Sequence, residues 1–297
     1  MSSLEKLSDR LWSGEVSTDQ PEHHPFAALD VLEELVPGVA FYKGFVNLTA
    51  LQTEEGLVLV DTGSYLPASH QRSYAAVRGW TDLPLHTAIY THGHVDHAYG
   101  LPPFLRELTS KGLARPRIVG HVDVGRRMER YAETSGYNSI INSRQFGVPI
   151  QWPTDPDPPT ITYTNRMDLR IGGRELRLVH ARGETDDHTW IHVPDAKVLI
   201  TGDLFIWAIP NAGNPQKVQR YAHDWSRALR EMAALEAEVL LPGHGLPILG
   251  AARVREALQE TAACLEFLYR ETVDRMNSGA TIYEIVEEVE LPEQLRE

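Results

Sequence analysis

The apolar residues of the chain fall into short runs whose period predicts the secondary structure. Continuous or alternating runs of about four to eight residues predict strands, most of them buried. These runs lie at 39–42, 46–51, 57–60, 85–91, 117–121, 160–164, 167–171, 175–180, 189–193, 198–203 and 239–244. Apolar positions that recur at helical spacing predict helices at 69–80, 103–111, 124–135, 225–236, 251–278 and 281–289.

Polar stretches divide this pattern. Residues 1–36 form a polar extension in which we expect two short helical patches, one of them at 30–36. Residues 136–165 are rich in Pro, Asn, Ser and Thr, which predicts a long loop, and such loops usually act as a lid or a cleft wall. Two stretches of consecutive strands have a similar layout. They predict an α/β fold of two halves whose sheets face each other, with helices outside.

The composition limits the classes of function. The 297 residues suffice for one large domain or a domain with an appendage. With 41 acidic against 28 basic side chains, the net charge of −13 argues against a general nucleic-acid binder. The single cysteine, Cys264, excludes an internal disulfide and is expected in the core. Because no apolar run approaches the length of a membrane span and no signal core is seen, we expect a cytoplasmic protein without membrane insertion.

The most informative stretch is His-Gly-His-Val-Asp-His at 92–97, between a predicted strand and a predicted helix. Imidazole and carboxylate groups this close suit a bound zinc ion, with iron or manganese as alternatives. His92 and His94 are two residues apart, so on an extended chain they leave the same face. Asp96 and His97 are offset by the turn. This one segment can therefore supply two ligands to each of two adjacent metal ions.

Three further candidate ligands lie at predicted strand ends beside glycine, where a tight turn is needed. They are Glu184, Asp203 and His244. Asp61 follows the strand at 57–60 and is expected either to accept a hydrogen bond from a metal-bound histidine and so orient it, or to cap the turn. His180 and His188 each lie four residues from Glu184. Either could replace Glu184 as a ligand or bind a substrate anion, and for His180 we expect, as for Asp61, a position behind the ligands from which it supports them.

The His-x-His-x-Asp-His motif resembles the signature of the metallo-β-lactamase superfamily. The resemblance implies a four-layer αββα sandwich over 1–250, with 1–36 as an N-terminal extension. In that superfamily a histidine commonly lies nineteen residues before the Asp of Gly-Asp, and here that position is Glu184. The implied assignment is one metal on His92, His94 and Glu184, a second on Asp96, His97 and His244, and Asp203 bridging both. We assign Asp96 and Asp203 to catalysis.

Glu184, the Asn-rich segment after Asp203 and the strand region from Phe45 resemble the alkylsulfatase branch, which hydrolyses alkyl sulfate esters at two zinc ions. The resemblance covers roughly 40–290 and implies attack of hydroxide on a small anionic ester. It makes the following residues candidates for binding the substrate: Asn47, His188, Asn211, Asn214, Lys217 and Arg220. In that branch the chain continues into a dimerisation domain. We therefore expect 251–297 to begin a dimerisation region in a shortened relative or a fragment, and a homodimer is plausible.

Other functions of the same residues stay open. One is another hydrolase of this fold, acting on a lactone, thioester, β-lactam or phosphate ester. Another is an oxygenase with a single iron, although Asp96, His97 and His244 form a full second set. The third is a binding protein without catalysis, which the loss of a ligand would have favoured, and none is lost.

Overall fold

The computed structural model describes residues 2–213 and 218–295. Asn214 and Lys217, two of the predicted substrate residues, lie outside this part of the chain. The first half contains α1 (Ser3–Trp12), β1 (Val31–Val36), β2 (Val39–Lys43), β3 (Leu48–Thr53), β4 (Gly56–Val60), α2 (Pro67–Trp80), β5 (Leu85–Ile89), α3 (Pro102–Ser110), β6 (Arg117–His121), α4 (Val122–Glu133), α5 (Ser135–Phe146) and β7 (Ile161–Tyr163). The second half contains β8 (Arg166–Ile171), β9 (Arg174–His180), β10 (Thr189–Val193), a 3-10 turn at Pro194–Ala196, β11 (Val198–Ile206), α6 (Ala222–Ala233), β12 (Val239–His244), β13 (Ile248–Leu249), α7 (Ala251–Asn277), α8 (Ile282–Glu288) and a 3-10 turn at Glu293–Leu295.

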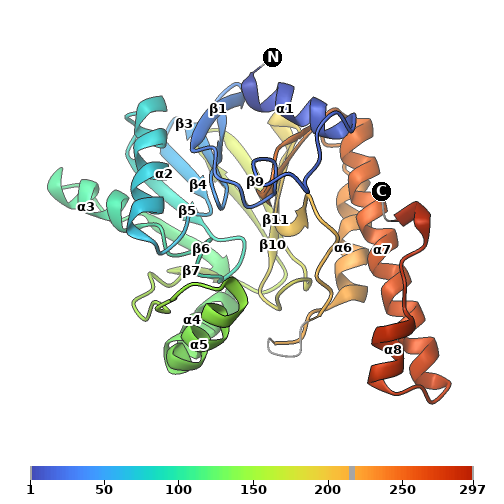
Figure 1. Cartoon of the computed structure of the whole chain (residues 1–297). Coiled ribbons are helices and arrows are strands. Elements are labelled where there is room, and N and C mark those ends of the chain that lie inside the picture. Colours follow the sequence, from blue (N-terminus) through green and yellow to red (C-terminus); the bar gives the residue numbers. More distant parts are fainter. Residues whose placement is uncertain (1, 214–217, 296–297) are drawn as a thin grey trace.

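The strands form two sheets, one from each half of the chain. The first has the order β1-β2-β3-β4-β5-β6-β7 and the second the order β13-β12-β11-β10-β9-β8. Each sheet begins as an antiparallel meander and becomes parallel where a helix provides the crossover, at β4–β5 in the first sheet and at β11–β12 in the second. Helices α2 and α3 lie outside the first sheet and α6 and α7 outside the second (Figure 1). This is the predicted αββα sandwich.

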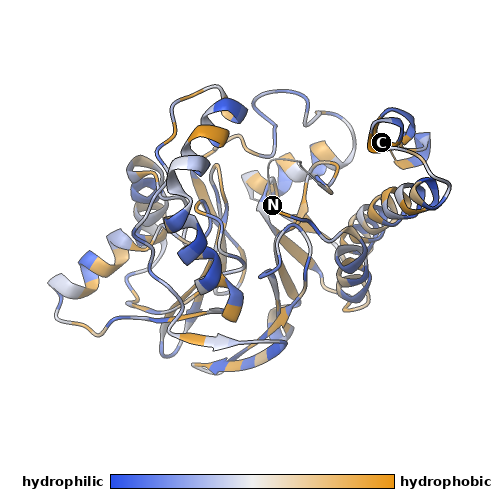
Figure 2. Ribbon diagram, turned by 90° about the horizontal axis from the view of Figure 1, so that it is seen from below, coloured by the Kyte–Doolittle hydropathy of each residue, from blue (hydrophilic) through white to orange (hydrophobic). Residues whose placement is uncertain are grey.

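Three apolar clusters hold the layers together. The first lies between the sheets and includes Phe41, Val60 and Leu178. The second joins the first sheet to α2, α3 and α4, and the third joins the second sheet to α6 and α7. Because β4 is buried on both faces, its near-continuous apolar sequence is what this position requires. Orange apolar residues accordingly concentrate on the strands in Figure 2.

Two sequence predictions about local structure were wrong. Residues 31–36 form strand β1, not a helical turn, because β2 offers an edge on which this short segment pairs in an antiparallel register. Residues 135–146 form helix α5 within the stretch predicted as a loop, and Gly147 ends it with a left-handed φ of 67°. The Pro-rich stretch 151–159 is irregular, as predicted.

The C-terminal helices extend the outer layer of the second sheet. The first half of α7 is part of the third cluster through Val254, Leu258 and Leu265, and Cys264 is buried, as predicted. Helix α8 lies against α7 away from the sheets (Figure 1). Among the helices of residues 2–213 and 218–295, none combines the length and the apolar character that crossing a bilayer needs.

Candidate metal centre

The predicted ligands meet at one edge of the two facing sheets. His92, His94, Asp96 and His97 lie in the turn that follows β5, and Glu184 lies in the β9–β10 loop. Asp203 is within β11, where its register with β12 shifts, and His244 is the last residue of β12. Since the carboxyl ends of parallel strands meet at such an edge, side chains from segments distant in sequence converge there.

The first group consists of His92, His94, Glu184 and Asp203, with one ligand atom of each within 4.8 Å of all the others. Nε2 of His92 and Nδ1 of His94 are 2.8 Å apart. Oε2 of Glu184 lies 3.9 Å from the former and 3.7 Å from the latter. Glu184 therefore lies close to both histidines, and its role as a metal ligand stays a prediction.

The second group consists of Asp96, His97 and His244. Oδ2 of Asp96 lies 3.5 Å from Nε2 of His244 and 3.8 Å from Nε2 of His97. Asp203 lies between the groups, with Oδ1 3.3 Å from Nε2 of His97 and Oδ2 3.9 Å from Nε2 of His92. This placement fits the bridging role predicted for Asp203.

Several features of the site fit a pair of cations. Oε2 of Glu184, Oδ1 of Asp203 and Nε2 of His97 are buried without a hydrogen-bond partner among the described residues, which is costly unless something binds them. A Cβ at Gly243 would lie 2.1 Å from Oδ1 of Asp203, so any larger residue would fill the site. The donor set of imidazole and carboxylate is the one that divalent zinc, iron or manganese takes.

The charges within the site offset one another. Burial opposes ionisation of Asp203, but His97 and His244 hold the pKa of its carboxyl well below the usual range. Burial, with Asp203 close by, raises the pKa of Glu184 to about 8. Burial and the nearby Arg127 lower the pKa of His94 to about 3, which leaves its ring neutral and able to bind a cation.

In three of the candidate ligand histidines, the ring nitrogen that points away from the site lies close to a hydrogen-bond acceptor. Asp61 Oδ2 accepts from Nδ1 of His97 at 2.7 Å, and the orientation of a metal-bound histidine by Asp61 stays a prediction. The carbonyl oxygen of Phe45 accepts from Nδ1 of His244 at 2.7 Å. Oγ1 of Thr91 lies 3.0 Å from Nδ1 of His92. Such contacts fix the ring orientation and leave the other nitrogen for a metal ion.

A buried ion pair beneath the site was missed by the sequence analysis. Nε of Arg127, on α4, lies 3.0 Å from Oδ2 of Asp187, and the same oxygen accepts from the backbone N–H of Gly93 at 2.9 Å. Arg127 also pairs with Asp186. The pair fixes the peptide between His92 and His94. An arginine on the apolar stripe of the predicted helix 124–135 was the available signal.

Arg220 contacts the first group, and Asn211 contacts Arg220. Nη2 of Arg220 lies 2.8 Å from Oε1 of Glu184, and its Nη1 donates to the carbonyl oxygen of Asn211 at 2.9 Å. Arg220 therefore contacts a candidate ligand directly, and its binding of a substrate anion stays a prediction.

The remaining predicted site residues lie elsewhere. Asn47 is buried and donates to the carbonyl oxygens of Pro242 and Gly245, so it holds the turn around His244. His188 has no exposed surface and stacks on the ring of His92, with centroids 4.3 Å apart. His180 stacks on His121 and its Nε2 lies 2.8 Å from the carbonyl oxygen of Asp186. None of the three belongs to a candidate ligand group among the described residues. The supporting role of His180 and the contact of Asn47 and His188 with a substrate stay predictions.

The sequence profile of the metallo-beta-lactamase superfamily matches residues 42–244. The chain belongs to this superfamily. The match ends at His244 and includes every candidate metal ligand, so the predicted superfamily is confirmed.

The relatives of this chain within the superfamily include alkylsulfatases. A linear primary-alkylsulfatase of Pseudomonas sp. is 28% identical over 267 residues, which is 82% of this chain and 50% of the relative. An (R)-specific secondary-alkylsulfatase of Pseudomonas sp. is 24% identical over 89% of this chain and 44% of the relative. The structure of the sec-alkylsulfatase Pisa1 from Pseudomonas sp. superposes with a TM-score of 0.75 at 22% identity, over 89% of this chain and 46% of that one. The chain thus spans about half the length of the curated relatives it matches, and the predicted resemblance to alkylsulfatases is confirmed.

Proposed function

We propose that this protein holds two divalent metal ions, zinc by preference, and hydrolyses a small anionic ester, most specifically an alkyl sulfate. The observation that carries the proposal is the convergence of two candidate ligand groups on Asp203, whose buried oxygen and nitrogen atoms include three without a hydrogen-bond partner in the part of the chain that the structure describes. The names of the relatives support the same reaction class. When bound, a pair of such ions lowers the pKa of water towards neutrality and neutralises the oxygens of an ester.

The residues of the chain have distinct tasks in this proposal. His92, His94 and Glu184 hold one ion, Asp96, His97 and His244 hold the other, and Asp203 is shared. Asp61 keeps the proton of His97 on Nδ1, so that Nε2 faces the site. Arg220, with one face towards Glu184, is the cation placed to attract the ester anion.

We also propose that 1–250 is the catalytic domain and that 251–297 begins a dimerisation region in a cytoplasmic homodimer. Ile282, Tyr283 and Val286 of α8 are 70%, 80% and 75% exposed, which is unusual for apolar side chains unless they meet a partner. Light scattering of the purified protein tests this assembly, and a monomer at micromolar concentration would refute it.

Elemental analysis together with sulfate release tests the main proposal. Purified protein is assayed for zinc, iron and manganese, and the same sample is offered short and long alkyl sulfates. The expected result is two zinc ions per chain and sulfate release that Asp203→Asn abolishes, while the exposed Asp168→Asn leaves it unchanged. Two zinc ions per chain without sulfate release would support the binuclear hydrolase site and refute alkyl sulfate as the substrate. A single iron would refute the binuclear assignment and favour an oxygenase.

A further inference from the structure

Two phenylalanines lie beside His244. The ring of Phe26 is 4.4 Å from that of His244 in an edge-to-face arrangement, and the ring of Phe45 is 5.9 Å from it. Phe26 and Phe45 stack on each other at 5.5 Å. Each is 38% exposed, so both present an open apolar face next to a candidate ligand. Phe26 belongs to the N-terminal extension and Phe45 to the β2–β3 loop.

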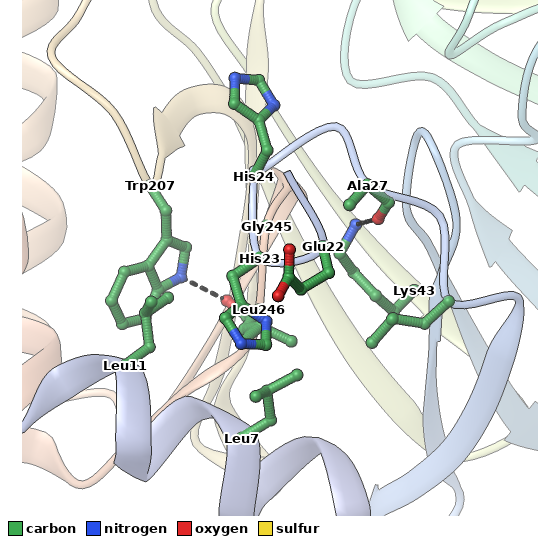
Figure 3. Close-up of a pocket in the computed structure, with 11 residues that line it drawn as sticks. Leu7, Leu11, Glu22, His23, His24, Ala27, Lys43, Trp207, Gly245 and Leu246 are labelled. Carbon is green, nitrogen blue, oxygen red and sulfur yellow. Dashed lines mark hydrogen bonds between the residues drawn. The ribbon is translucent and has the colours of Figure 1, made fainter. Parts of the chain in front are cut away.

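A buried lysine holds both phenylalanines in place. Nζ of Lys43 donates to the carbonyl oxygens of Pro25 and Ala27, on either side of Phe26, at 3.1 and 2.7 Å. It also donates to the carbonyl oxygen of Gly44, directly before Phe45, at 2.7 Å. Figure 3 shows Lys43 directed at Ala27 beneath the 22–27 segment. One ammonium group therefore fixes the backbone on which both rings are carried.

The segment is also tied to the turn that carries His244. The backbone N–H of Gly245 donates to the carbonyl oxygen of Pro25 at 3.0 Å. Lys43, Trp207 and Leu246 line a small cavity next to this segment (Figure 3). There the carbonyl oxygen of Leu246 accepts a hydrogen bond from Nε1 of Trp207 at 2.7 Å. The position of Phe26 relative to the site is thus set by hydrogen bonds on both sides of it.

The two ends of the site differ in polarity. The Glu184 end carries Arg220, whereas the His244 end carries Phe26 and Phe45. Arg220 suits an anionic group, and exposed aromatic faces suit an apolar one. A ligand that joins the two groups matches both ends at once.

We propose that Phe26 and Phe45 form the wall that binds the apolar organic group of the ester, and that Lys43 is the positioning residue for this wall. The inference rests on the proposed function and specifies which residues bind the organic group, with the anionic head of the ester towards Arg220. Each methylene that leaves water for the wall increases affinity by up to about fourfold.

The test measures binding to unreactive probes, so that it does not depend on turnover. Zinc-loaded protein is titrated by calorimetry with n-alkyl sulfonates from methyl to dodecyl. The affinity of the wild type is expected to increase with chain length. Phe26→Ala and Phe45→Ala should each reduce the gain per methylene, and the double variant most, while affinity for methyl sulfonate stays within about twofold. Phe146→Ala removes an exposed aromatic ring at the end of α5 and is the matched control.

Lys43→Met tests the positioning role, with zinc content and methyl sulfonate affinity as internal references. The expected result is a smaller increase in affinity per methylene, with zinc content and methyl sulfonate affinity unchanged. The proposed wall would be refuted if affinity increased equally per methylene in the wild type and in both phenylalanine variants. It would also be refuted if the affinity of the wild type did not depend on chain length. An unchanged gain in Lys43→Met would overturn the positioning role. If affinity depends on chain length but no sulfate is released from alkyl sulfates, the proposed wall is supported and the proposed reaction is refuted.

Discussion

The Asp61 carboxylate accepts a hydrogen bond from Nδ1 of His97 at 2.7 Å while its backbone has a left-handed φ of 55°. Its other oxygen accepts from the backbone N–H of Thr91 at 2.8 Å. The first contact orients the imidazole and the second fixes the carboxylate to the strand next to it. A non-glycine residue with positive φ costs free energy, and such strain tends to persist at functional sites.

Asp61→Asn is expected to weaken metal retention by about 10- to 100-fold, because an amide gives His97 a weaker acceptor than a carboxylate does. Asparagine tolerates the left-handed backbone, so the fold should be kept. Competition with a chromogenic chelator measures the change. Asp30→Asn is the matched control, since Asp30 has the same φ of 55° and lies outside the ligand groups. Equal retention in the wild type and Asp61→Asn would contradict the role of Asp61.

On acidification, Arg220→Gln is expected to lose its metal ions at a pH roughly one unit higher than the wild type does. Arg220 lowers the pKa of Glu184 against the effect of burial, so without it the carboxyl takes up a proton at a higher pH and ceases to be a ligand. Dialysis across a pH series followed by elemental analysis measures the shift. Arg220→Lys keeps the charge and should shift the profile less. A separate rise in KM would support binding of the substrate anion by Arg220.

Arg127→Met is expected to lower the free energy of unfolding by about 3–5 kcal/mol, because it leaves Asp187 as a buried charge without its partner. The neighbouring Arg126→Met should cost less than about 1 kcal/mol, since the side chain of Arg126 is 72% exposed. Urea unfolding of the metal-loaded proteins measures both. The double variant Arg127→Met/Asp187→Asn should recover part of the loss, and a failure to recover any would argue for lost packing instead.

The difference in the free energy of unfolding between the wild type and Lys43→Met is expected to change with pH in the alkaline range. Burial lowers the pKa of Lys43 to about 8, while in the unfolded chain it is about 10.4. Between these pH values the unfolded state binds more protons than the folded state. The free energy of unfolding of the wild type therefore increases by up to about 3 kcal/mol as the pH rises through this window. Below pH 8 the difference should be constant. Urea unfolding at several pH values measures it, and a flat difference from pH 7 to 10 would contradict the burial of a charged lysine.

The layered fold and the candidate ligands could be predicted from the sequence because they depend on local signals. Strands such as β4 and β5 are buried on both faces and show it as apolar runs. The ligands of the β5 turn are neighbours in sequence, and Glu184, Asp203 and His244 lie beside the glycines that tight turns need. The roles of these residues as metal ligands stay predictions until a metal is measured.

What the sequence could not provide depends on tertiary contacts. Whether 31–36 forms a strand is decided by the free edge of β2, not by its own residues. Asn47 was placed near a substrate, but only the folded chain shows its amide held by Pro242 and Gly245. Phe26 lies in a polar extension, and nothing local predicts that its ring meets His244 edge to face.

The ligand groups draw on both sheets, with His92 and His97 from the first and Asp203 and His244 from the second. Bound ions would therefore act as cross-links between two halves of the chain that are far apart in sequence, and closing so long a loop restricts the unfolded chain. A ligand that binds only the folded state also stabilises it by mass action. Loss of the ions should then remove the link between the two sheets and shorten the lifetime of the folded protein.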